Sequence, residues 1–310
     1  MADGTHIQWS DATWNIITGC SITSPGCTNC YAMKLAGSRL RHHPSRVGLT
    51  EPSKAGPVWT GEVRFNEQWL DQPLRWKRPR KIFVCAHGDL FHENVPDDWI
   101  DRVFAVMALC PQHTFQVLTK REERMYEYLI EISEKYAARP YDLDDHLGGH
   151  GDEIAPDRHG GALIDMTQWP IPNVWLGVTA ENQEQADARI PDLLATPAAK
   201  RLVSVEPMLG PVSLAHIRHP LFRGAYIDAL DGHVWHEDGC VSLTDHPNHP
   251  ALDWVICGGE SGPGARNSDF ADHARALRDQ CASAGVKFFG KQDFGGKPMP
   301  ADLDITEFPA

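Results

Sequence analysis

The sequence has no long apolar run, and other common signatures are also missing from its 310 residues. No stretch approaches the roughly 18 apolar residues that a membrane-spanning helix needs, so we expect no membrane association. The first residues, Met1-Ala2-Asp3-Gly4-Thr5-His6, lack the basic and apolar regions of a secretory signal. There is no internal repeat and no low-complexity tract. These absences predict a cytoplasmic protein.

Positive charge is also scarce. Lysine and arginine number 29 against 42 aspartates and glutamates, which gives a net charge of −13. This is the wrong sign for a protein that coats nucleic acid non-specifically. One basic run, Arg75-Trp76-Lys77-Arg78-Pro79-Arg80-Lys81, departs from the acidic background. Such a run is typical of a solvated turn that leads into a strand, although it leaves a local basic groove open.

Cysteine, by contrast, is present in an informative arrangement. The chain has eight cysteines, and in the cytoplasm these favour metal or redox chemistry over disulfides. Cys20, Cys27 and Cys30 have the spacing C-x6-C-x2-C, in a loop stiffened by Ser24-Pro25-Gly26. Three thiolates can hold three corners of a cubane iron–sulfur cluster and leave the fourth iron open to a small molecule.

Two other interpretations of these cysteines stay open on spacing alone. The thiols could belong to a structural zinc site, with His42 or His43 as the fourth ligand. They could also be unrelated buried cysteines, because free cysteine packs as a small hydrophobic residue.

Short apolar runs recur along the chain, each followed by polar or glycine residues and then by a helical pattern. The expected strands are 82–86, 114–118, 174–178, 201–205, 254–257 and 286–290, and the expected helices are 97–108, 122–136, 183–194 and 269–284. Alternation of this kind predicts a parallel sheet, and we expect an α/β fold, a partial TIM-type barrel of six or seven β/α units. Polar residues follow every strand, at the edge where barrels and open sheets place their sites.

We expect one domain over residues 1–310, interrupted by two loop insertions at about 141–172 and 216–250. The second insertion is rich in metal-ligand residue types: His216, His219, His233, His236, Cys240, His246 and His249. It could bind a second metal, but no pair has zinc-finger spacing, which favours a polar excursion without metal.

Several motifs together resemble one known family. They are Trp14-Asn15 before Gly19-Cys20, Ser24-Pro25-Gly26-Cys27 with Cys30-Tyr31-Ala32, Asp89-Leu90-Phe91-His92-Glu93, Gln116 to Arg121, Trp175 to Val178, Glu206 to Pro211, Gly258 to Pro263, and Phe288 to Gln292. From about Trp9 to about Lys297 the chain resembles the phage gene-product 37/68 family, a branch of the radical S-adenosylmethionine superfamily. The commonest superfamily spacing is C-x3-C-x2-C with an aromatic residue before the last cysteine. Here the first gap is six residues, and Asn29 stands in the aromatic position.

The resemblance implies a 4Fe-4S cluster on Cys20, Cys27 and Cys30, with S-adenosylmethionine (SAM) chelated by the open iron. An electron from a donor such as flavodoxin or ferredoxin would cleave SAM to a 5′-deoxyadenosyl radical, which abstracts hydrogen from an unknown substrate. The cofactor then carries the difficult step, and the protein positions and shields it. The phage association of the family and the basic run favour a nucleic acid or nucleotide as substrate.

Residues at the strand ends are the expected cofactor and substrate contacts, and no catalytic residue is identified. The cofactor candidates are Asp89, Thr119, Lys120, Glu181, Asn182, Glu206, Gly258, Gly259 and Glu260, and the substrate candidates are Arg121, Lys291 and Gln292. Asp89 could instead cap a helix, and the glycines could simply form a tight turn, since no G-x-G-x-x-G fingerprint follows. Two other functions stay open: a zinc-stabilised binding module without catalysis, and a redox regulator that uses the cluster but never cleaves SAM.

Overall fold

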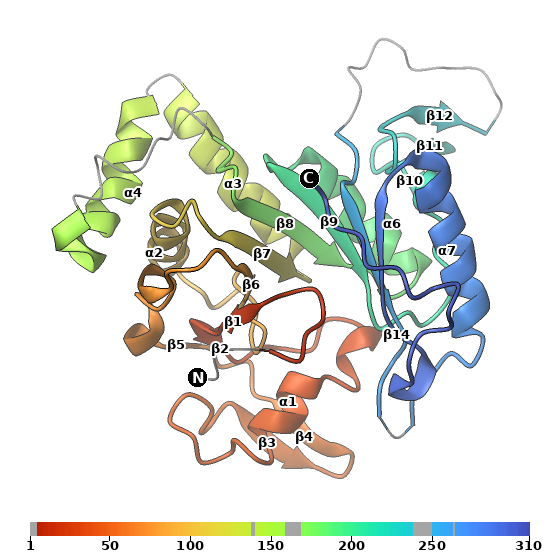
Figure 1. The fold of residues 1–310 in the computed structure, drawn as a ribbon, viewed down its shortest axis with the longest axis horizontal. Coiled ribbons are helices and arrows are strands. Elements are labelled where there is room, and N and C mark those ends of the chain that lie inside the picture. Colours follow the sequence, from red (N-terminus) through yellow and green to blue (C-terminus); the bar gives the residue numbers. More distant parts are fainter. Residues whose placement is uncertain (1–4, 138–139, 159–168, 238–249, 263) are drawn as a thin grey trace. The chain divides into compact units, whose positions relative to one another are not determined.

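The computed structural model describes residues 5–137, 140–158, 169–237, 250–262 and 264–310 (Figure 1). Its main sheet has seven parallel strands in the order β1-β6-β7-β8-β9-β13-β14. These strands are β1 (Ala12–Trp14), β6 (Lys81–Val84), β7 (Thr114–Thr119), β8 (Val174–Thr179), β9 (Lys200–Val205), β13 (Trp254–Gly258) and β14 (Lys287–Gln292). The prediction of an α/β fold of the partial (β/α)6–7 barrel class is confirmed.

The chain divides into two compact units, and the first comprises Met1–Thr23, Cys30–Trp175 and Pro197–Ala199. In it β6 pairs in parallel with both β1 and β7. Its helices are α1 (Tyr31–Ala36), α2 (Asp97–Ala108), α3 (Glu122–Ala137) and α4 (Pro140–Ile154), with short 3₁₀ turns η2 (Glu67–Trp69), η3 (Pro73–Arg75) and η4 (Pro156–Arg158). Two small antiparallel pairs complete it: β2 (Ile17–Thr18) with β5 (Arg64–Phe65), and β3 (Thr50–Ser53) with β4 (Gly56–Trp59).

The second unit comprises Ser24–Asn29, Leu176–Thr196 and Lys200–Ala310. In it β13 pairs in parallel with both β9 and β14. Its helices are α6 (Gln183–Ala195) and α7 (Phe270–Ala284), and its 3₁₀ turns are η1 (Pro25–Cys27), η6 (Leu214–His216) and η7 (Phe294–Gly296). A separate antiparallel sheet contains β10 (Ile217–Arg218), β11 (Ala225–Ile227) and β12 (Val234–His236).

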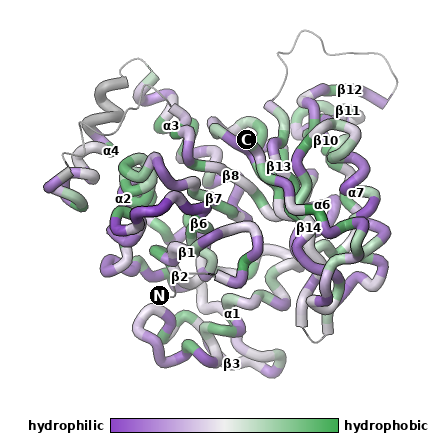
Figure 2. Tube along the Cα trace, viewed as in Figure 1, coloured by the Kyte–Doolittle hydropathy of each residue, from purple (hydrophilic) through white to green (hydrophobic). Residues whose placement is uncertain are grey.

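Burial explains why these segments form these elements. All residues of β8 and of β13 are buried, as expected for central strands covered on both faces. Helix α2 buries an apolar face, visible as green segments in Figure 2, and begins after Pro96 with Asp97 and Asp98 at its positive end. Helix α7 ends at Gly285, whose left-handed φ of 73° suits a glycine cap.

The six expected strands and four expected helices are all present, with boundaries that differ from the expected ones by at most two residues. The sequence reading missed β1 as a strand of the sheet because it spans only three residues. The first insertion contains helix α4, where a loop was expected, and the second contains the β10–β12 sheet. The single-domain assignment of 1–310 stays a prediction. Among the described residues, no helix is both long and apolar enough to cross a membrane.

Candidate functional site

In the first unit, the Cys20 thiol lies beside a buried arginine. Arg121, which directly follows β7, donates from Nη1 to Cys20 Sγ at 3.2 Å and to Asp89 Oδ2 at 3.2 Å. Burial, and then the nearby Asp89, raise the pKa of Cys20 to about 12, although Arg121 opposes this shift. Without a metal, the thiol is therefore protonated at neutral pH. A metal ion would supply the positive charge that a thiolate needs here.

Asp89 lies after β6 and is almost completely buried. Its Oδ1 accepts hydrogen bonds from the Thr119 hydroxyl (2.7 Å) and the Phe91 N–H (3.1 Å). Its Oδ2 accepts from the Lys120 N–H (3.1 Å) in addition to Arg121. A carboxylate offers about four lone-pair sites, and all four are used. Asp89 thus ties the ends of β6 and β7 together and orients Arg121. Its contact with the cofactor stays a prediction.

Arg121 also fixes the backbone next to Cys20. Its Nη2 donates to the Ser21 carbonyl (3.2 Å) and hydroxyl (2.5 Å), and its Nε donates to Glu93 Oε2 (3.2 Å). Ser21 donates in turn to Glu93 Oε1 at 2.7 Å. Burial raises the pKa of Glu93, but the Ser21 hydrogen bond and Arg121 outweigh it, and the pKa falls to about 2. Arg121, with its rigid fork of donors, therefore holds Cys20 and Ser21 together.

The residue before Cys20 must be glycine. Gly19 has φ +94°, and a Cβ there would lie 2.1 Å from the carbonyl oxygen of Glu62. The motif Gly19-Cys20 therefore reflects both a left-handed backbone and a close approach of two chains.

Cys30 precedes helix α1, and both Cys30 and Cys20 pack against one apolar cluster. The cluster consists of Ala32, Met33, Ala36, Leu49 and Trp59. Such an apolar wall excludes water from one side of these two thiols.

Tyr31, next to Cys30, contacts the segment that follows β6. Its hydroxyl donates to the Ala86 carbonyl at 2.5 Å, and its ring lies edge-on to the His87 ring. The Nδ1 of His87 accepts from Arg46 at 2.7 Å, since arginine can only donate. Burial, and then Arg46, lower the pKa of His87 to about 4, so the ring is neutral at pH 7.

In the second unit, a buried glutamate anchors the loop that carries Cys27. Glu181 follows β8 and is completely buried, and its Oε1 accepts from the Gly26 N–H at 2.9 Å. Its Oε2 accepts from Arg189 at 3.0 Å, and the same arginine nitrogen donates to the Thr179 carbonyl at 2.6 Å. The Glu181–Arg189 pair therefore holds the turn η1 in place through the backbone N–H of Gly26.

A second strand-end glutamate holds the same loop. Glu260, just after β13, is buried and receives both fork nitrogens of Arg266 in a bidentate pair. Arg266 also donates from Nη2 to the Pro25 carbonyl at 3.0 Å, and the Asn29 side chain bonds to Glu260. Burial raises the pKa of Glu260, but the Arg266 hydrogen bonds lower it more, so Glu260 is ionised. Residues 24–29 are thus clamped from two sides through Glu181 and Glu260.

The remaining strand ends of this unit pair with each other. Lys291, in β14, donates to Glu206, which follows β9. Gln292 donates from Nε2 to the Gly259 carbonyl at 2.9 Å, and a Cβ at Gly259 would lie 2.6 Å from the Phe294 nitrogen. A Cβ at Gly258 would come within 3.1 Å of the Glu206 carboxyl group. These residues, which the sequence predicts to bind the cofactor or substrate, therefore contact one another in the structure. Their roles in ligand binding stay predictions.

Asn182 has a local role. Its Oδ1 accepts from the Gln185 N–H at 3.0 Å and so caps the N-terminus of α6. Its predicted role as a cofactor contact is not tested.

The histidines considered as zinc ligands are engaged elsewhere. His42 Nε2 accepts from Arg41 at 2.9 Å, and His43 Nδ1 bonds to the Ser45 hydroxyl at 2.7 Å. In the second insertion, His233 pairs with Asp231 and His236 bonds to the Arg223 carbonyl. Cys240, His246 and His249 lie outside the described residues, so the second-metal hypothesis for this insertion stays untested.

The basic run forms the turn from η3 into β6. Arg75, Lys77 and Arg78 are exposed, and Arg80 stacks over the Trp76 ring at 4.9 Å. This agrees with a solvated turn and leaves the nucleic-acid hypothesis untested.

Sequence reasoning missed the cations that hold the cysteine segments. Arg189 and Arg266 were not singled out, and Arg121 was assigned to substrate although it contacts Cys20. One signal was available for Arg189: it lies beside Ile190 in the otherwise apolar buried face of α6, where an arginine needs a buried partner.

A family model described as "Protein of unknown function (DUF5131)" matches residues 4–301. No curated protein matches the chain. One solved structure, "Spore photoproduct lyase complexed with dinucleoside spore photoproduct", has a TM-score of 0.41 and 10% identity over 90% of this chain and 76% of the other. A cysteine-to-serine mutant of spore photoproduct lyase has a TM-score of 0.40 and 10% identity over 94% of this chain and 79% of the other. At these scores neither likeness bears on activity.

Proposed function

The chain belongs to the DUF5131 family of proteins of unknown function, and from its own residues we propose that it is a radical SAM enzyme. Cys20, Cys27 and Cys30 would hold a 4Fe-4S cluster, as their spacing indicates. The motifs that resemble the phage gene-product 37/68 family support this proposal, because that family belongs to the radical SAM superfamily, whereas the matching family model names no activity. When bound, the cluster and SAM would supply a 5′-deoxyadenosyl radical by one-electron cleavage of the sulfonium bond.

The donor chemistry of the cysteine segments fits such a cluster. Among the described residues, none of the three cysteines is joined to another by a disulfide. Cys20 and Cys30 line an apolar wall, and Cys20 receives an N–H from a cation. Hydrogen bonds to cluster ligands, apolar shielding and local charge are the features by which proteins tune iron–sulfur centres. The contact between Arg121 and Cys20 is the observation that carries the proposal, because a buried arginine that donates to a cysteine sulfur opposes the rise in its pKa and would stabilise the thiolate once a metal is bound.

The roles of the strand-end residues follow from their contacts. Asp89 and Thr119 orient Arg121, which holds the Cys20 side of the loop. Glu181, and Glu260 through Arg266, hold the backbone just before Cys27. Residues that fix cluster ligands in this way keep them in place when the metal is absent. Lys120, Glu206, Gly258 and Gly259 remain candidates for the walls of a SAM site.

We place the substrate among nucleic acids or nucleotides. The support is the exposed basic turn around Lys77 and Arg78. Retention of a labelled oligonucleotide in a mobility-shift assay at low salt would support this class, because phosphate attraction is strongest there. No shift at low salt would count against it.

Anaerobic reconstitution tests the activity. The protein is loaded with iron and sulfide, reduced with dithionite and given SAM, and 5′-deoxyadenosine is measured by mass spectrometry. We expect brown protein, four irons per chain and deoxyadenosine formation. Cys27→Ala should abolish the product, whereas Cys110→Ala, at a buried cysteine in the loop after α2, should leave it unchanged.

Other outcomes identify the alternatives. Colourless protein with one zinc per chain and no redox activity would indicate a zinc-stabilised binding module. A reducible cluster without deoxyadenosine would indicate a redox regulator. Full product formation after replacement of all three cysteines would overturn the cluster assignment.

A further inference from the structure

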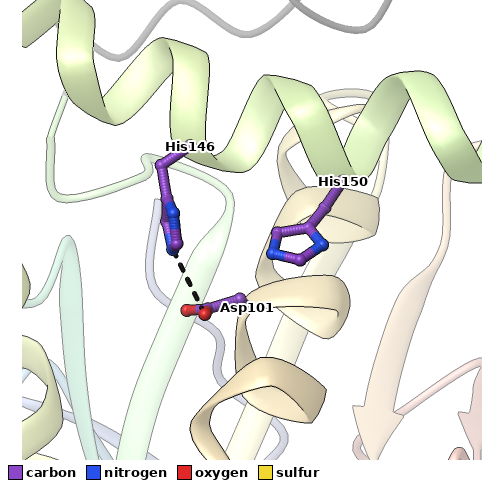
Figure 3. A group of neighbouring side chains, drawn as sticks. All are labelled: Asp101, His146 and His150. Carbon is purple, nitrogen blue, oxygen red and sulfur yellow. Dashed lines mark ion pairs between the residues drawn. The ribbon is translucent and has the colours of Figure 1, made fainter.

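Three side chains far from the cysteine segments come together between helices α2 and α4 of the first unit. Asp101 lies in α2, and His146 and His150 lie four residues apart in α4, on one face of that helix (Figure 3). One ligand atom from each residue lies within 4.8 Å of the other two. In Figure 3 both imidazoles extend from α4 toward the Asp101 carboxylate.

The spacing is close to that of a zinc site. His146 Nε2 lies 3.2 Å from Asp101 Oδ2. Ligand atoms about 2.0–2.2 Å from a tetrahedral zinc ion are separated from one another by about 3.4 Å. The Asp101–His146 pair therefore already has the required separation, and a shift of about 1–2 Å of the His150 side chain closes the third position.

The group contains features that internal hydrogen bonding leaves unexplained. His150 Nδ1 is buried, and among the described residues it has no hydrogen-bond partner. Buried polar atoms normally have one, and a metal ion bound at this nitrogen would supply it. Asp101 is a carboxylate on the buried face of α2, next to Ile100 and Phe104. A carboxylate in such a place needs cationic or hydrogen-bonding partners.

Tyr128, from α3, orients the carboxylate. Its hydroxyl donates to Asp101 Oδ1 at 2.6 Å, which leaves Oδ2 facing His146. Metal-binding carboxylates are commonly held by such a second hydrogen bond.

We propose that Asp101, His146 and His150 bind a zinc ion that joins α4 to α2. Two imidazoles and one carboxylate suit zinc, whereas calcium and magnesium prefer sets made of oxygen atoms. Helix α4 also needs such a link. It contains Gly148, Gly149 and Gly151, and glycine disfavours a helix because it loses the most backbone freedom on folding. The metal offsets this weakness by fixing two successive turns of α4 to a helix of the barrel.

Zinc titration of the full-length, chelator-treated protein tests the proposal. The variants are His150→Ala and Asp101→Asn; the asparagine keeps an acceptor for Tyr128. His233→Ala, at an exposed histidine in the second unit, is the matched control. The three N-terminal thiols are the same in every protein, so a difference in bound zinc reports this site alone. We expect wild type and control to bind one more zinc per chain than either variant, with affinity at this site reduced about 100-fold in the variants.

Hydrogen exchange provides a readout that does not depend on counting metal. Zinc should slow amide exchange in α4 of the wild type and of His233→Ala, and should leave it unchanged in His150→Ala. The proposal is overturned if zinc leaves α4 exchange in the wild type unaltered, whatever the variants do. Equal zinc content in wild type and folded variants overturns it as well. Loss of the iron–sulfur cluster would not affect either result, so the two proposals fail separately.

Discussion

Replacement of Arg121 by alanine should destabilise the protein more than replacement of any surface arginine. The Arg121 and Asp89 side chains are 8% and 6% exposed, so their ion pair is buried. Removing one partner of a buried pair costs about 3–5 kcal/mol, because the other charge stays desolvated. Asp89 keeps its bonds from Thr119, Phe91 and Lys120, which places the expected cost near the lower end, at about 3 kcal/mol. The Glu93 contact adds little, because that carboxylate is 55% exposed.

Urea unfolding of the metal-free protein, followed by circular dichroism, measures this loss. Arg124→Ala is the matched control, since Arg124 lies three residues further on in α3 and pairs with the exposed Asp97. That surface pair is worth about 0–1 kcal/mol. The loss of stability in Arg121→Lys should lie between those of the two alanine variants, because lysine keeps the charge but lacks the several N–H donors with which arginine reaches Ser21 and Glu93. If Arg121→Ala and Arg124→Ala lose the same stability, Arg121 does not organise the Cys20 segment.

Three further predictions concern pH, backbone and the Cys27 loop. The pKa of His87 is lowered from 6.5 to about 4, so its neutral ring favours the folded state above pH 6.5. This contribution is lost as pH falls from 6.5 to 4, and His87→Asn should remove about 3 kcal/mol of the pH dependence in urea unfolding. Gly48→Ala should cost about 1–2 kcal/mol of stability, since Gly48 has φ +82° and open space around it. Gly19→Ala should cost more, because its Cβ would also clash with the Glu62 carbonyl. Equal losses of stability in thermal melts of the two variants would contradict this clash. Glu181→Ala should cost about 3–5 kcal/mol of stability and reduce iron loading in a colorimetric assay, because the buried ion pair with Arg189 and the hydrogen bond to Gly26 are lost. Asp302→Ala, at an exposed carboxylate, is the control and should change neither quantity. Normal iron loading in Glu181→Ala would contradict the anchoring role.

The sheet could be predicted from the sequence because its strands are short, apolar and separated by amphipathic helices. The run Val174 to Val178 is one example, and it became β8 with every residue buried. Helix α4 could not be predicted, because its glycines and aspartates read as a loop and periodicity gives no sign of a contact with α2. Long-range packing overrides weak local propensity at such places.

The candidate site was predictable in position but not in its internal pairing. Parallel strands end at one edge, so Asp89, Glu181, Glu206 and Glu260 could be expected at strand ends. Which cation each carboxylate meets depends on contacts between segments far apart in sequence. Glu260, for example, binds Arg266, and Arg266 reaches back 241 residues to Pro25. Single-sequence patterns carry no information on pairs of that kind.

Electron paramagnetic resonance of the reduced, reconstituted protein tests the central claim most directly. Three cysteine ligands leave one iron of the cluster open, so the spectrum of a reduced 4Fe-4S cluster should appear and should change shape when SAM is added. A spectrum that SAM does not alter, or a reconstituted protein without any cluster signal, would contradict the account.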